Sequence, residues 1–162
     1  MSDIYVSLEE TPLDITTLMQ KVQSDAHGAI DLFIGTVRNN HQGHSVTGIT
    51  YDAHEEIAKS VFTQICAEAM GVWPDTKYAI SHFKGELPVG GISIIIAVSS
   101  AHRAESFEAC RYVIEEIKTR APIWKQEHYV TGKSAWLPGH SLKDEANTTE
   151  ICCGKCCGGK HA

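Results

Sequence analysis

Residues 92–127 read ISIIIAVSSAHRAESFEACRYVIEEIKTRAPIWKQE, and this stretch decides the fold. Residues 92–99 are mostly apolar, which predicts a buried strand in the centre of a sheet. We expect Ser100 to cap the helix that follows and Pro122 to stop it. The residues expected on the buried face of this helix are Phe107, Cys110, Ile114 and Ile117, spaced by three and four. Residues 123–130 predict the last long strand.

The chain on the N-terminal side of this stretch predicts further strands and two more helices. Strands are expected at residues 4–8, 29–37, 46–51 and 78–83, with polar loops at 38–44 and 84–91. The first helix is expected to begin with Thr11 as its cap and to end at residues 27–28. The second is expected to begin at Asp52 and to close at Trp73-Pro74. Its expected core face is Ile57, Ala58, Val61, Phe62, Ile65 and Cys66. The order βαββαββαβ favours an α+β fold, with helices packed on one face of a mostly antiparallel sheet.

Length and charge narrow the class of protein. The chain has 162 residues, which suits one domain. Its 14 basic against 20 acidic residues give a net charge of −6, which argues against nucleic acid as the main partner. No apolar run approaches the roughly 20 residues that span a bilayer, and the N-terminus lacks the pattern of a signal peptide. We therefore expect a cytoplasmic protein.

Basic side chains nevertheless gather around the helix of residues 100–121. They are His102, Arg103, Lys118, Arg120 and Lys125. A strand that feeds a helix N-terminus forms an anion site, to which Arg103 can add a bidentate clamp. At about 1.5 Å per residue, Arg103 and Lys118 lie roughly 22 Å apart along one helix. Either one ligand is long enough to touch both, or the two groups meet across a subunit interface, and we take the second as a hypothesis. The alternative is that His102 and Arg103 are solvated residues of the helix start.

Lys118 and Lys125 flank a turn that Pro122 fixes, so their ammonium groups could converge on one site. Two ammonium groups held close together disfavour each other's charge, which would leave a lysine able to act as a base or nucleophile. The alternative is that Lys118 and Arg120 only complement the helix C-terminus. Arg38 ends an apolar strand, where it could point into a functional crevice or form an edge salt bridge.

Metal binding is weakly supported by the sequence. The loop histidines His41 and His44, with His54, lack a Cys or acidic partner at a known zinc spacing. Cys66 and Cys110 are expected to be small core residues. Four further cysteines lie close together near the C-terminus: Cys152, Cys153, Cys156 and Cys157. They contain one C-x-x-C spacing, and three interpretations stay open: a tail without function, metal or redox binding, and regulation by a partner. We expect a domain over residues 1–137 and a weakly ordered tail over 138–162.

Four segments resemble the catalytic (large) subunit of molybdopterin synthase, the MoaE family. They are FIGTVRN (33–39), GEL (85–87) with Gly90, SSAHR (99–103) followed by FEA (107–109), and KTRAPIWK (118–125). The last two are specific in both composition and spacing, and the resemblance covers roughly residues 4–136. It implies an α/β hammerhead-type fold, a homodimer, and a small ubiquitin-like sulfur carrier (MoaD) bound to each subunit in a heterotetramer.

The resemblance also implies a reaction and its residues. The carrier's C-terminal thiocarboxylate would give sulfur to cyclic pyranopterin monophosphate (precursor Z), making the dithiolene of molybdopterin. Lys118 and Lys125 match catalytic positions of the family. Substrate-binding positions match Thr36, Val37, Arg38, His102, Arg103, Lys118, Lys125, Gln126 and Glu127. No cofactor is implied. The sulfur arrives on the partner, so no cysteine of this chain need be a nucleophile. The alternatives are a non-catalytic binding module for a phosphorylated, pterin-like metabolite, and a metal-handling protein built on the cysteine tail.

Overall fold

The computed structural model describes residues 2–137. The elements are β1 (Ile4–Glu9), α1 (Ile15–Val22), β2 (Ala29–Thr36), β3 (Asn40–His41), β4 (His44–Ala53), α2 (Glu55–Val72), β5 (Thr76–Phe83), β6 (Gly85–Pro88), β7 (Ile92–Ser100), α3 (Arg103–Arg120), β8 (Ile123–Tyr129) and β9 (Ser134–Trp136). Along this part of the chain, two strand-rich segments, β2–β4 and β5–β7, separate the three helices. The α+β prediction is confirmed.

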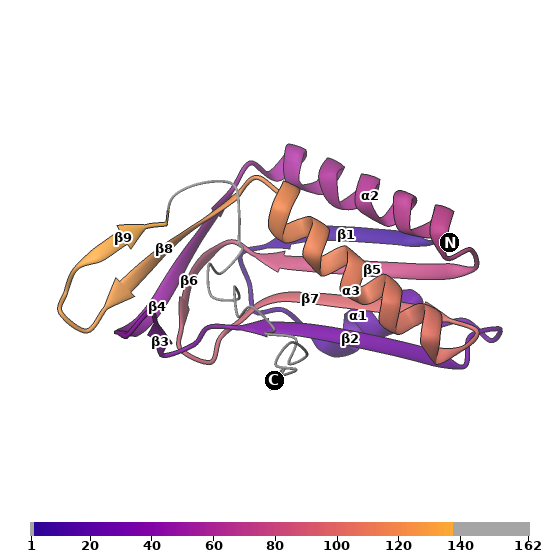
Figure 1. Ribbon diagram of the computed structural model, residues 1–162, viewed down its shortest axis with the longest axis horizontal. Helices are drawn as coiled ribbons and strands as arrows, with labels where there is room; N and C mark the ends of the chain where they lie inside the picture. Colours follow the sequence, from indigo (N-terminus) through magenta and orange to yellow (C-terminus); the bar gives the residue numbers. More distant parts are fainter. Residues whose placement is uncertain (1, 138–162) are drawn as a thin grey trace, which may run out of the picture.

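The strands form two sheets that lie end to end along the molecule (Figure 1). The first has the order β1-β5-β7-β2, in which only the β1–β5 pair is parallel. The second has the order β3-β4-β8-β9, with β6 also paired to β4, and its pairs are antiparallel. As predicted, β7 is a central strand, and its side chains from Ser93 to Ser100 are buried.

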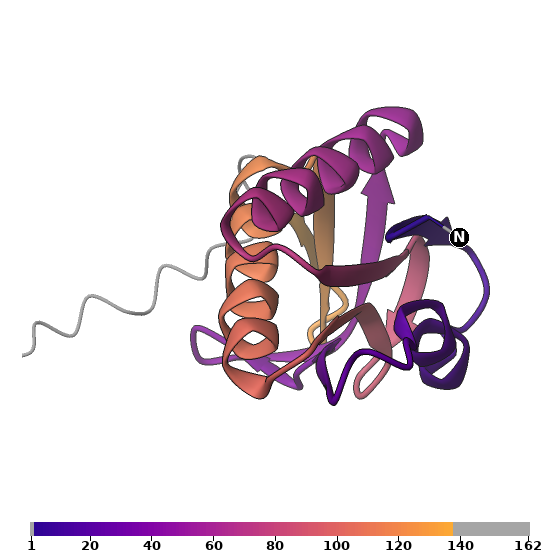
Figure 2. The ribbon, with the colours of Figure 1, turned by 90° about the vertical axis from the view of Figure 1, so that its right-hand side faces the viewer.

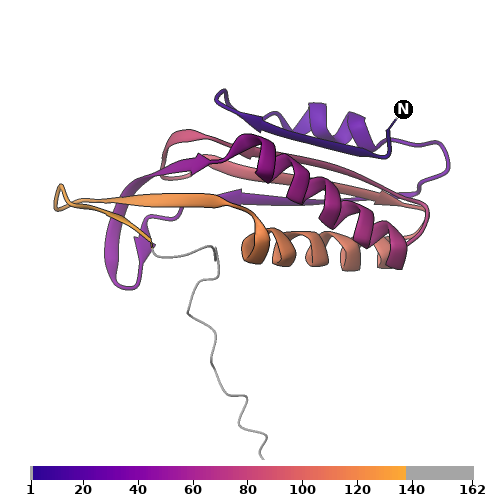
Figure 3. The ribbon, with the colours of Figure 1, turned by 90° about the horizontal axis from the view of Figure 1, so that it is seen from above.

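The two long helices cover one face of the first sheet, and α1 covers the other. Strand β7 shows this division, since Ile94 and Ile96 belong to the core cluster under α2 and α3, whereas Ile95 packs with Leu18 and Val22 of α1. Figures 2 and 3 show α1 and α3 on opposite sides of the strands. The expectation that the helices share one face therefore holds for α2 and α3 and is wrong for α1. An apolar strand such as β7 needs cover on both faces.

Three short strands were expected to be loop or to lie beyond the last strand. They are β3, β6 and β9, and each has four residues or fewer. Strand β3 forms a hairpin with β4 through Gln42 and Gly43, both of which have positive φ. Such short segments carry too little alternation to predict a strand, and pairing with β4 or β8 creates them.

The helix starts lie a few residues from the predicted caps. Helix α1 begins after Asp14, whose carboxylate accepts hydrogen bonds from the backbone N–H groups of Thr16 and Thr17, so Thr11 is not its cap. Asp52 lies in β4, and α2 begins after His54. Helix α3 begins after His102, and the Ser100 hydroxyl donates to the His102 carbonyl at 2.6 Å. The predicted stops at Trp73-Pro74 and Pro122 are confirmed by the C-caps at Trp73 and Ala121.

Two residues expected in the core are exposed. Ile57 on α2 is 49% exposed and Phe107 on α3 is 57% exposed. The buried face of α2 is instead Ala58, Phe62, Ile65, Cys66 and Ala69. That of α3 is Ser106, Ala109, Cys110, Val113 and Ile117. Small residues face the sheet because each helix packs closely against it and against the other helix. The side-chain volume that fits between them therefore decides which residues of a helix are buried, as much as hydrophobicity does.

Close approach of β4 and β6 depends on Gly48. A Cβ at this position would lie 2.7 Å from the Leu87 carbonyl oxygen, a backbone atom that cannot swing away. We expect Gly48→Ala to lower the free energy of unfolding by about 2 kcal/mol or more, measured by urea denaturation. Gly71 in α2 is the matched control, because a Cβ there meets nothing within 4 Å. Gly71→Ala should stabilise the helix by about 0.5–1 kcal/mol. Equal stability of the Gly48 variant and the wild type would show that the close approach of β4 and β6 does not depend on Gly48.

Candidate functional site

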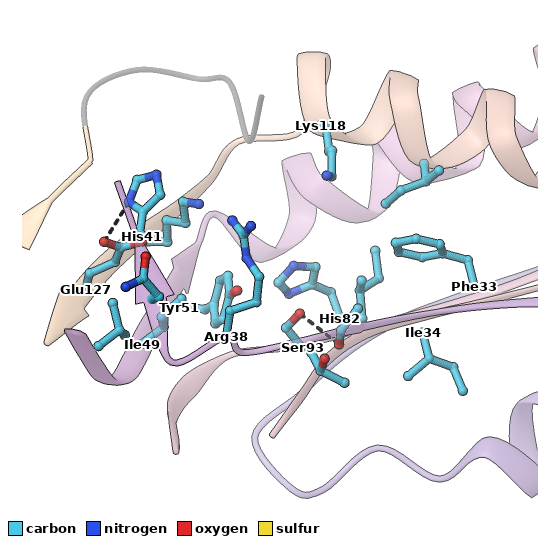
Figure 4. Close-up of a pocket in the computed structure, with 17 residues that line it drawn as sticks. Phe33, Ile34, Arg38, His41, Ile49, Tyr51, His82, Ser93, Lys118 and Glu127 are labelled. Atoms are coloured by element: carbon cyan, nitrogen blue, oxygen red, sulfur yellow. Dashed lines mark hydrogen bonds and ion pairs between the residues drawn. The ribbon is translucent and has the colours of Figure 1, made fainter. Parts of the chain in front are cut away.

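A cavity of about 320 Å³ lies where the two sheets meet, beneath the C-terminal end of α3 (Figure 4). Its walls come from β2 and the loop after it, β4, the end of β5, the start of β7, α3 and β8. The charged and titratable side chains that line it include Arg38, His41, Tyr51, His82, Lys118, Lys125 and Glu127. Apolar side chains such as Phe33, Ile49 and Ile114 form much of the rest. The cavity therefore combines an apolar surface with a concentration of positive charge.

The turn at Pro122 brings Lys118 and Lys125 to this one cavity. Helix α3 ends at Arg120, and the backbone N–H of Ala121 still donates to the Ile117 carbonyl. Strand β8 then begins at once with Ile123, so the last turn of the helix and the first residues of the strand face each other. In Figure 4 the Lys118 side chain points from α3 down into the cavity.

Arg120 has a different environment from Lys118. Its guanidinium makes two hydrogen bonds to the carboxylate of Glu68 on α2, at 2.6 and 3.0 Å, and a third to Glu116 at 3.2 Å. These bonds raise the pKa of Arg120, and the Arg120 bond lowers the pKa of Glu68. Of the two residues that could have served the helix C-terminus, Arg120 ties α3 to α2, whereas Lys118 faces the cavity.

The segment after β2 presents Arg38 to the cavity. Val37 is buried, its backbone N–H donates to Gly91, and its carbonyl accepts from Gly90. This anchoring places Thr36 and Arg38 on the lining, with Val37 behind them. Figure 4 shows the Arg38 side chain rising into the cavity from the strand end. Val37, a substrate-binding position implied by the resemblance, instead has its backbone groups bonded to the loop before β7.

A buried carboxylate closes the far side of the cavity. Glu127 on β8 is 2% exposed, and its Oε2 accepts hydrogen bonds from His41 Nδ1 and the Tyr129 hydroxyl, both at 2.9 Å. Partial burial, with the hydrogen bond to Glu127, raises the pKa of Tyr129. This cluster fixes the β3–β4 hairpin over β8, so the same carboxylate lines the cavity and holds its wall.

Three residues predicted for the site lie away from the cavity within this chain. His102 and Arg103 are exposed at the start of α3, and Lys118 is near its other end. Gln126 points to the opposite face of β8 from Lys125 and Glu127, as alternation along a strand requires, and its amide donates to the Ser134 hydroxyl. The structure thus brings together Thr36, Arg38, Lys118, Lys125 and Glu127 on the lining, with Val37 behind them, but not these three.

Sequence reasoning missed His82 and Tyr51 in the cavity wall. Both are buried, and their rings meet edge to face with centroids 5.2 Å apart. Burial lowers the pKa of His82 to about 4, and a hydrogen bond with the Phe83 carbonyl opposes this shift only in part. Alternation along β5 could have placed His82 on the same face as Tyr78 and Ile80.

The two cysteines in the described part of the chain are core residues. Cys66 and Cys110 are buried, as predicted, and burial raises the pKa of each thiol to about 12. Residues 2–137 contain no group of three or more His, Cys, Asp or Glu side chains placed to hold a metal ion. None of their helices is long and apolar enough to cross a membrane. Cys152, Cys153, Cys156 and Cys157 lie outside the described residues.

An α+β fold with a lysine- and arginine-lined cavity between two sheets defines a class of protein suited to binding a small anionic molecule. The family model described as "MoaE protein" matches residues 8–120. The chain belongs to the MoaE family. It is 40% identical over 146 residues to the molybdopterin synthase catalytic subunit of Synechococcus elongatus, covering 90% of this chain and 88% of the relative.

Solved structures agree with this membership. Molybdopterin synthase from Staphylococcus aureus is similar with a TM-score of 0.78 and 32% identity, over 86% of this chain and 99% of the other. The fold also recurs in a complex of subunits 1 and 2 of molybdopterin-converting factor from Helicobacter pylori, with a TM-score of 0.66 and 23% identity. That likeness covers 86% of this chain and 93% of the other.

Proposed function

We propose that this chain is the catalytic subunit of a molybdopterin synthase. It transfers sulfur from the thiocarboxylated C-terminus of a small ubiquitin-like carrier, MoaD, to cyclic pyranopterin monophosphate. The observation that carries the proposal is the convergence of Lys118, Lys125 and Arg38 on one cavity, in a chain 40% identical to a named catalytic subunit. A binding module for a phosphorylated metabolite would need cations, but not two lysines on a proline-fixed turn.

The reaction requires stabilisation of negative charge at several oxygens. Each transfer forms a carbon–sulfur bond on the pterin side chain, and the carrier's acyl carbon takes an oxygen from water to become a carboxylate. Two carriers are consumed for each dithiolene. Opening the cyclic phosphate releases negative charge onto oxygen, which fixed ammonium groups stabilise. Lys118 is the group we assign to this charge or to the acyl intermediate, with Lys125 as the second catalytic lysine.

The remaining assignments concern binding. Arg38 suits the phosphate because a guanidinium can donate two parallel hydrogen bonds. We propose that His102 and Arg103 complete the pocket from a second copy of this chain, because one helix separates them from Lys118 by roughly 22 Å. We further propose a homodimer core that binds two carriers, giving a heterotetramer located in the cytoplasm. The Helicobacter pylori complex of two subunits has the same fold and is consistent with a small partner protein.

The proposal is tested by incubating the purified chain with thiocarboxylated carrier and cyclic pyranopterin monophosphate. Mass spectrometry of the pterin product should show the gain of two sulfur atoms. A carrier that ends in an ordinary carboxylate is the matched control and should give no product. Absence of product with a thiocarboxylated carrier that is active with another synthase would overturn the proposal.

Arg38→Ala should raise the KM for the pyranopterin about 10- to 100-fold, because it removes a charge-assisted hydrogen bond. The kcat at saturating substrate should change much less, since the lysines remain. Steady-state kinetics at a fixed carrier concentration measure both constants. Arg111→Ala is the control, because Arg111 is exposed on α3, away from the cavity lining, and forms a salt bridge with Glu115. An unchanged KM in the Arg38 variant would contradict the phosphate role.

A further inference from the structure

His82 lies where β5 ends, at the junction of the two sheets. It pairs in register with Ile94 of β7 and Leu8 of β1, and its side chain lines the cavity that holds Lys118 and Lys125. The residue is only 2% exposed. Figure 4 shows the ring in the cavity wall between the Arg38 and Phe33 side chains. A polar ring at such a depth needs a defined partner for each nitrogen.

One nitrogen of this ring has its partner in the protein. His82 Nδ1 lies 2.8 Å from the Phe83 carbonyl oxygen. A carbonyl can only accept, so Nδ1 carries the proton and donates it. In the neutral ring, Nε2 is then a hydrogen-bond acceptor. Because burial lowers the pKa to about 4, the ring stays neutral near pH 7 and is too weak a base to take a proton from a lysine.

The basic side chains of the cavity can donate hydrogen bonds to a ligand but cannot accept them. Arg38, Lys118 and Lys125 in their charged forms are donors only. The Glu127 carboxylate already accepts two hydrogen bonds at Oε2, from His41 and Tyr129. The edge-to-face contact with Tyr51 and the bond to Phe83 fix the plane of the His82 ring. The ring therefore offers an oriented, uncharged acceptor beside the donors of Arg38, Lys118 and Lys125, and in addition to the Thr36 and Ser93 hydroxyls.

We infer that His82 Nε2 accepts a hydrogen bond from an N–H or O–H group of the bound substrate and so orients the ring system while the cations hold the phosphate. This inference rests on the proposed function, which supplies a pterin whose ring nitrogens and exocyclic amine are donors. His82 is a substrate-positioning residue in this role and takes no proton during the reaction. It distinguishes a pterin phosphate from an anion that has no donor.

Two substitutions separate the two nitrogens of the ring. In His82→Asn the amide nitrogen can still donate to the Phe83 carbonyl, but no acceptor reaches the position of Nε2. In His82→Gln the longer side chain places an amide oxygen near that position. We expect the Asn variant to raise the KM for the pyranopterin about tenfold with little change in kcat, and the Gln variant to recover much of the loss.

Sulfate is the control ligand, because it is an anion without a hydrogen-bond donor. Calorimetric titration of the whole protein should give the same sulfate affinity in the wild type and the Asn variant, whereas Arg38→Ala should weaken both sulfate and pyranopterin. Equal pyranopterin KM in wild type and Asn variant, or equal losses of sulfate and pyranopterin affinity, overturns the inference. Failure of the proposed function would show differently, as a wild-type protein that neither binds nor converts the pyranopterin.

Discussion

Lys118→Ala should abolish formation of the dithiolene while the protein stays folded and still binds its carrier. The Lys118 side chain lines the cavity and leaves the helix–helix contact to Arg120. Removing one preorganised charged group that stabilises developing negative charge costs about 10²–10³-fold in rate. A lysine that also formed a covalent bond to the substrate or the acyl group would cost more. Single-turnover assays of sulfur transfer measure the loss directly.

Two further variants serve as controls for the Lys118→Ala experiment. Lys118→Arg keeps the positive charge but removes the amine, so partial activity would indicate an electrostatic role, and none would indicate that the amine itself reacts. Arg111→Ala removes a cation from the same helix at an exposed position and should behave as the wild type. Normal sulfur transfer by the Ala variant would remove Lys118 from the mechanism.

The long, strongly patterned elements of this fold could be predicted from the sequence. Strand β7 is almost wholly apolar, and Trp73-Pro74 and Pro122 stop helices for covalent reasons that no tertiary contact can change. Helix starts are less determined, because several polar residues in a row can each serve as a cap. At α3 the chain passes over Ser100 and begins the helix after His102.

The buried face of each helix depends on how closely the helix packs against the sheet, and hydrophobic periodicity does not reveal that distance. Phe107 fits an apolar stripe by spacing, but the small residues Ser106 and Ala109 face the sheet. The exposure of Ile57 has the same origin, since Ala58 takes the inward position on α2. A sequence pattern gives the period of a helix, whereas packing distance chooses between two adjacent stripes of similar hydrophobicity.

In the candidate site, residues near one another in the sequence were predicted and residues from distant strands were not. Lys118 and Lys125 are seven positions apart around a fixed turn, so their convergence follows from local geometry. His82 and Tyr51 enter the cavity only because β4 and β5 belong to different sheets that meet there. Their contact depends on strand pairing between segments far apart along the chain, which one sequence does not disclose.

The stability of the folded protein should fall as the pH is lowered from about 6.5 to 4, and His82 should account for a large part of this fall. Its pKa is about 4 in the folded protein against 6.5 ordinarily. Between these values the unfolded chain binds a proton at His82 that the folded chain does not, so the free energy of unfolding rises with pH. The penalty is absent above pH 6.5, grows as the pH falls, and becomes constant below pH 4. Its full size is about 3 kcal/mol.

Urea denaturation at fixed protein concentration, repeated between pH 7 and 4, measures this dependence. His82→Asn removes the titrating group, so its unfolding free energy should depend less steeply on pH, whatever its stability at pH 7. Carboxylates with lowered pKa, such as Glu68, also lose stabilisation as they protonate, but they do so in both proteins. The difference between the two curves therefore isolates His82. Parallel curves would show that His82 has the same pKa in the folded and the unfolded protein, and they would contradict the claim that burial keeps its ring neutral below pH 6.5.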